Sequence, residues 1–78
     1  MTAHYDLTLP ADSTFATRLA WAGDRYADLA EGIMPTHVGW LVWNMVIGWT
    51  DIGQTKDEVR QLNEIGSQIA DLIRSLEG

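Results

Sequence analysis

The spacing of apolar side chains divides this chain into an N-terminal arm and three helical segments. In residues 13–32 apolar positions recur at intervals of three and four, which places them along one side of an α-helix. This apolar seam consists of Phe15, Leu19, Ala22, Tyr26, Leu29 and Ile33. Asp12 or Ser13 is expected to cap the helix, and Gly32 together with Pro35 predicts its end.

The second segment, residues 35–50, differs from its neighbours because it contains no charged side chain. Three of the four tryptophans of the chain lie here, and apolar residues occupy every side of the helical projection. A helix that is apolar all round is expected to be buried all round. Asn44 is the internal polar side chain of this run, and it needs a hydrogen-bond partner if it is buried.

The third predicted helix covers residues 55–77 and begins with a clear capping signal. Thr55 and Glu58 have the spacing of a capping box, in which each side chain binds the backbone amide of the other residue. Apolar residues then follow at intervals of three and four, in a stripe wide enough for a bundle helix. Gly66 lies within this stripe, and we expect it to form a socket for a tryptophan of the second segment.

Residues 1–12 form the arm, in which Tyr5, Leu7 and Leu9 alternate with polar residues before Pro10. This alternation has the period of a β-strand, but a single short strand is not stable alone. The arm therefore either lies extended over the helices as coil or pairs with a strand of another chain. We favour the first arrangement, since short terminal segments commonly pack as coil.

These patterns predict an all-α fold in a single domain, a three-helix bundle or helical hairpin with an extended arm. An isolated bundle would leave part of the apolar middle helix in water, so we expect a homodimer or a small higher oligomer. The expected interface consists of Val38, Trp40, Trp43, Ile47 and Trp49. The alternative is a monomer in which the arm covers the middle helix.

Composition narrows the classes of partner. The 78 residues include eleven acids and five bases, and the net charge of −6 argues against direct binding to nucleic acid or to anionic membranes. The chain has no cysteine, so neither disulfides nor thiolate metal sites are available. The strongly apolar run is of a length more typical of a core helix than of a membrane span. We expect a cytoplasmic protein that does not bind membranes.

The sequence contains no catalytic or cofactor-binding motif, so we predict a protein that is not an enzyme and has no cofactor. Asp24, Asp28 and Glu31 have a helical spacing that could hold a divalent metal, but they project away from the apolar seam. We therefore interpret them as a solvated acidic face and expect no metal site. His4 and His37, the two imidazoles, are expected to be capping or surface residues.

The predicted function is that of a small acidic protein–protein interaction module. Trp21 lies off the seam beside Arg25 and is the best candidate for contacting a foreign partner, together with the acidic face. The alternative is an inhibitor of a nucleic-acid-binding complex, with acids imitating phosphates; phage-encoded anti-CRISPR inhibitors are similar in size and charge. A second alternative is an oligomeric small-ligand binder that uses Asn44 and His37.

Overall fold

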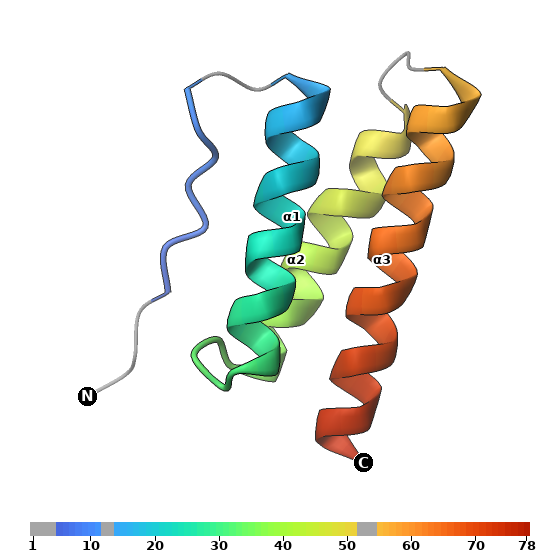
Figure 1. The fold of residues 1–78 in the computed structure, drawn as a ribbon. Helices are drawn as coiled ribbons and strands as arrows, with labels where there is room; N and C mark the ends of the chain where they lie inside the picture. Colours follow the sequence, from blue (N-terminus) through green and yellow to red (C-terminus); the bar gives the residue numbers. More distant parts are fainter. Residues whose placement is uncertain (1–4, 12–13, 52–54) are drawn as a thin grey trace.

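A computed structural model describes residues 5–11, 14–51 and 55–78, and within these ranges the chain forms three α-helices and an extended arm (Figure 1). Helix α1 spans Phe15–Ala30, α2 spans Thr36–Gly48 and α3 spans Lys56–Glu77, with a short 3-10 turn, η1, at Trp49–Asp51. Helix α2 runs antiparallel to both α1 and α3. The described residues contain no β-strand, so the predicted all-helical class and the three segments are confirmed.

Side chains at the start of α1 and α3 fix where each helix begins. Thr14 caps α1, because its hydroxyl accepts a hydrogen bond from a backbone amide of the first turn. The caps that we predicted, Asp12 and Ser13, lie outside the described residues. Thr55 and Glu58 form the complete capping box at the start of α3, as predicted.

The end of α1 is a tight backbone turn that depends on one glycine. Gly32 has a φ angle of 77°, a left-handed conformation that glycine adopts without a steric penalty. The amide of Ile33 binds the carbonyl of Asp28 at 2.9 Å, and the amide of Gly32 binds that of Leu29 at 3.2 Å. This pair of bonds is a Schellman motif, so Gly32 ends α1 as the sequence predicted.

The core lies between α3 and the other two helices. Helix α3 packs against both α1 and α2, and it does so more extensively than α1 and α2 pack against each other. The largest fully buried side chains are Leu29, Val42, Val46, Leu62, Ile69 and Ile73. A β-carbon added to Gly66 would lie 2.9 Å from the end of the Ile47 side chain. Gly66 is therefore a socket, but the prediction that a tryptophan fills it was wrong.

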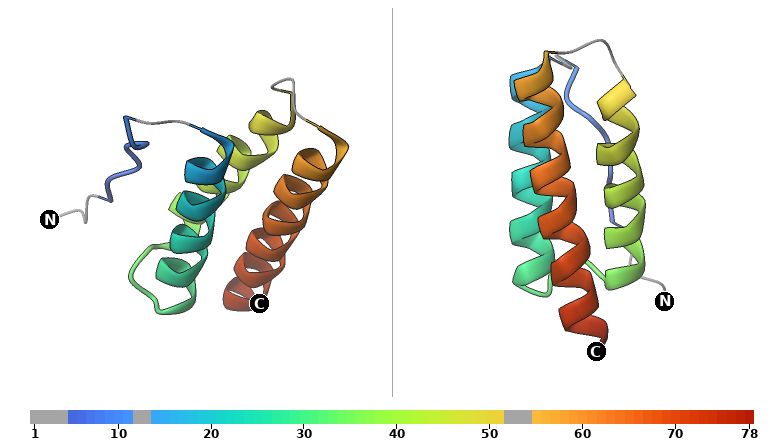
Figure 2. Two further views of the ribbon diagram at one scale, coloured as in Figure 1. Left: turned by 45° about the horizontal axis from the view of Figure 1, so that its top comes forward. Right: turned by 90° about the vertical axis from the view of Figure 1, so that its right-hand side faces the viewer.

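The arm lies along the side of the bundle where α1 and α2 are adjacent (Figure 2). Tyr5, Leu7 and Leu9 are partly buried and pack against the core, as the alternating pattern of the arm implied. Within the described residues of this single chain, the arm is extended coil that packs on the helices, which is the arrangement that we favoured. The arm thus supplies apolar cover where the two helices pack less closely.

Within a single chain, helix α2 is exposed along one side, as we expected of an isolated bundle. His37, Leu41, Asn44 and Gly48 are exposed, at intervals of four, three and four residues. This spacing puts two polar side chains and a glycine on one side of the helix, with Leu41, which is 52% exposed, between them. Among the described residues, no helix combines the length and the apolar character needed to cross a bilayer.

Candidate functional site

Helix α1 separates its charges onto two sides. Its outer face, which we define by Ala16, Ala20, Asp24, Ala27 and Glu31, is exposed to solvent. All five side chains are small or acidic, and this face contains no basic residue. The two arginines of α1 lie on the side that the arm covers, where they contact aromatic rings. The acidic face predicted from the sequence is therefore present at Asp24 and Glu31.

Trp21 lies off the apolar seam, as the spacing predicted, but its side chain is buried. Its side chain is only 5% exposed. It packs edge-to-face against Trp49 with 5.7 Å between ring centroids, and the Arg25 guanidinium lies 5.4 Å from its ring. The apolar seam of α1 faces α3, whereas Trp21 lies off this seam and packs against Trp49 and Arg25.

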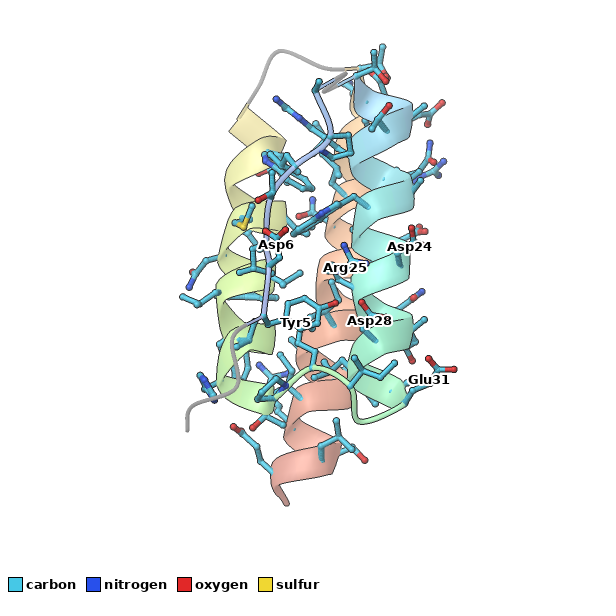
Figure 3. The ribbon with its side chains drawn as sticks, turned by 90° about the vertical axis from the view of Figure 1, so that its left-hand side faces the viewer. Tyr5, Asp6, Asp24, Arg25, Asp28 and Glu31 are labelled. Atoms are coloured by element: carbon cyan, nitrogen blue, oxygen red, sulfur yellow. The ribbon has the colours of Figure 1, made fainter. Side chains whose placement is uncertain are left out.

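A polar cluster holds the arm to α1 near its first described residue (Figure 3). The Tyr5 hydroxyl donates a hydrogen bond to the Asp28 carboxylate, and Arg25 Nε donates to the same carboxylate at 3.0 Å. The Arg25 guanidinium also lies 5.9 Å from the centre of the Tyr5 ring. Burial of Tyr5 and its hydrogen bond to Asp28 raise the pKa of this hydroxyl above its ordinary value. Asp28 is thus part of an internal contact, unlike Asp24.

Two buried hydrogen-bond donors in the first half of α1 have no acceptor among the described residues. The Arg18 guanidinium lies 5.5 Å from the Trp49 ring, so Arg18 and Trp21 both contact the same indole. Arg18 Nε and Trp21 Nε1 are buried, and neither has a hydrogen-bond partner among the described residues. Buried polar groups in folded proteins are nearly always paired, which makes two such donors around one ring unusual. We call Arg18, Trp21, Arg25 and Trp49 the arm-covered strip.

The residues that we predicted to form an oligomer interface make contacts within the chain. Trp49 is 7% exposed and packs against Trp21, so it does not need a second chain for its burial. Ile47 packs at Gly66 of α3. Trp40 Nε1 donates to Glu77 at 3.3 Å, and the Trp40 ring packs edge-to-face against Trp43. Val38 is also partly buried. Each of the five predicted interface residues thus has only part of its surface, or almost none, exposed to a second chain: Val38, Trp40, Trp43, Ile47 and Trp49.

The described residues offer little for metal or small-ligand chemistry. They contain no group of three or more histidine, aspartate or glutamate side chains that could hold a metal ion. His37 and Asn44 are exposed on the outside of α2 and do not converge on the interior. An open depression of about 510 Å³ lies against α3, lined by residues such as Arg60, Glu64 and Ser67. His4 lies outside the described residues.

No protein-family model matches the chain, and no curated protein or solved structure is detectably similar to it.

Proposed function

We propose that this chain is a non-enzymatic interaction module that presents the acidic outer face of α1 to a protein partner. The separation of charge across α1 supports this proposal. Asp24 and Glu31 face solvent, whereas Arg18 and Arg25 are drawn inward by contacts with aromatic rings. The alanines of this face, Ala16, Ala20 and Ala27, leave the helix backbone open to close approach by another surface.

Charge on an exposed face acts mainly on the rate of encounter and on the choice of partner. The net charge of −6 favours a basic partner, and the attraction weakens as salt shortens the Debye length, which is about 8 Å at physiological ionic strength. Complex formation is therefore expected to be faster at low salt than at high salt.

A pair of charge reversals tests this proposal. Asp24→Lys changes the outer face of α1, and Glu64→Lys makes the same change in charge at an exposed mid-helix position of α3. Each variant serves as bait for proteins from the native source. We expect the wild-type and Glu64→Lys chains to recover a common partner that Asp24→Lys loses. Loss of that partner by both variants, or by neither, would refute the role of the outer face.

We also propose that the module associates with itself through apolar side chains that its own chain leaves in water. Ile33 is 60% exposed, Leu41 52% and Leu76 49%. The turn after α1 and the last turn of α3 lie at the same end of the bundle (Figure 1), so Ile33 and Leu76 belong to one end of the molecule. Light scattering of the wild type should show a mass above 8.7 kDa that Leu41→Asp lowers to that of one chain. A wild-type mass of one chain at all concentrations would exclude self-association.

The inhibitor of a nucleic-acid-binding complex is the second candidate, favoured by the absence of bases on the outer face of α1. If the recovered partner binds nucleic acid, duplex DNA should compete for it with the wild-type chain. Binding of chain and DNA to the same partner at once would exclude mimicry of phosphates.

A further inference from the structure

We propose that the arm-covered strip is a docking site for an extended peptide that brings a carboxylate to Arg18 and Trp21, with the arm as its built-in occupant. This surface shares no residue with the acidic outer face of α1. The proposal therefore stands apart from the function proposed above and is tested separately.

The unpaired donors of the strip indicate what the ligand must supply. The Arg18 and Trp21 side chains contact the same Trp49 ring. Arg18 Nε and Trp21 Nε1 are buried, and neither has an acceptor among the described residues. A carboxylate has two acceptor oxygens and forms charge-assisted bonds with a guanidinium, so it matches this pair of donors.

The arm shows what form of chain the strip accepts. Tyr5, Leu7 and Leu9 pack on the core at every second residue, so an extended segment fits along α1. Tyr5 lies beside Asp28, and from there the arm runs toward the beginning of α1 (Figures 1 and 3).

The length of this segment places its end near the unpaired donors. Four extended steps from Tyr5 to Leu9 cover about 13 Å. Ten helical residues from Asp28 back to Arg18 cover about 15 Å. In the arm, Leu9 is followed by Pro10, so the main chain continues beyond Leu9 and has no terminal carboxylate at this position. A peptide that stops after five residues would place its terminal carboxylate close to Arg18 and Trp21.

The probe is the pentapeptide Tyr-Asp-Leu-Thr-Leu, acetylated at its N-terminus and prepared with either a free C-terminal carboxylate or a C-terminal amide. Calorimetry with the full chain measures the affinity of both forms. We expect the acid to bind about tenfold more tightly than the amide, as befits a charge-assisted hydrogen bond. The net charge of −6 repels the additional negative charge of the acid peptide. Tighter binding of the acid than of the amide would therefore come from hydrogen-bond donors near the carboxylate. A third peptide, amidated and ending in Glu, distinguishes a side-chain carboxylate from a terminal one.

Variants of the chain identify the groups responsible. Tyr5→Phe removes the hydrogen bond to Asp28, so the arm leaves the strip more often and the acid peptide should bind several-fold more tightly. Arg18→Gln should remove the preference for the acid. Arg74→Gln is the matched control, because Arg74 lies 5.9 Å from the Trp40 ring in a similar contact elsewhere. Trp21→Phe keeps an aromatic ring but lacks the N–H group, so it should reduce the preference in a folded chain.

Three results would overturn the proposal. The first is equal affinity for the acid and amide peptides, or failure of both to bind the Tyr5→Phe chain. The second is an acid preference that survives Arg18→Gln and Trp21→Phe in chains whose circular dichroism is that of the wild type. The third is dimerisation of Tyr5→Phe without peptide binding, which would show that the strip takes the arm of a second copy.

Discussion

The same substitution, glycine to alanine, should have opposite effects at two helical positions of this protein. At Gly23, in α1, no heavy atom among the described residues lies within 4 Å of the position that a β-carbon would take. Alanine is favoured over glycine in a helix interior by about 0.5–1 kcal/mol. Gly23→Ala should therefore raise the free energy of unfolding by about that amount.

At Gly39, in α2, an added β-carbon would meet the interior of the bundle. It would lie 3.0 and 3.1 Å from two atoms of Ile73 and 3.3 Å from Leu29, and both side chains are fully buried. Overpacking of this kind typically costs about 1–3 kcal/mol, which exceeds the gain in helix propensity. Gly39→Ala should therefore lower the free energy of unfolding, by about 1 kcal/mol net at the middle of that range.

Thermal and urea unfolding of the two variants measure this difference. The variants should differ by about 2 kcal/mol, which for a domain of this size corresponds to roughly 10 °C in Tm. Adding Ile73→Val to Gly39→Ala removes the nearest atom and should recover part of the loss in a double-mutant cycle. If Gly39→Ala stabilises the chain as much as Gly23→Ala does, α2 and α3 do not pack as closely as described.

Three further perturbations have definite expected outcomes. Thr55→Ala breaks the capping box of α3 and should cost about 1 kcal/mol in urea unfolding, with an unchanged m-value. Leu29→Ala empties a fully buried position and should cost about 2–5 kcal/mol, a large share of the total stability of a small domain, in the same assay. The raised pKa of Tyr5 means that the arm contact is complete below about pH 10 and is lost as pH rises through the folded-state pKa. A pH titration of tyrosine absorbance in a Tyr26→Phe chain should therefore show that the pKa of Tyr5 is higher than that of the free amino acid. A Tyr5 pKa at the ordinary value would contradict the contact with Asp28.

The helices were predictable from local signals, because each signal involves residues close in sequence. The capping box at Thr55 and the glycine turn at Gly32 depend on four and six consecutive residues, and both form as predicted. The alternation of Tyr5 and Leu9 with polar residues likewise predicted that one side of the arm is buried. Such features need no knowledge of how the helices are arranged.

The candidate site was less predictable, because it depends on which side of each helix meets the arm. Trp21 is off the seam that faces α3, and it is buried where it packs against Trp49 and Arg25. Arg18 and Arg25 lie on this same side of α1, where they contact aromatic rings and not the exposed acids Asp24 and Glu31. The alternating apolar residues of the arm indicate that it packs on the helices, but the sequence does not specify on which side of the bundle it packs.

The residues on the exposed side of α2 were missed for a different reason. Its mean apolar character concealed the regular spacing of His37, Asn44 and Gly48, which marks the side that water contacts. Size also misled the prediction at Gly66. The unbranched end of the Ile47 side chain fits the space above this glycine, whereas Trp40 and Trp43 are only partly buried.

The four indoles occur as two separate pairs, and this gives the molecule two optical reporters. Trp21 and Trp49 pack together beside the arm, whereas Trp40 and Trp43 pack together next to the final turn of α3. Intrinsic fluorescence is sensitive to the surroundings of each ring, so departure of the arm and fraying of the C-terminal helix should alter different parts of the emission. Replacing one pair with phenylalanine would therefore allow each end of the chain to be followed by itself, without an attached dye.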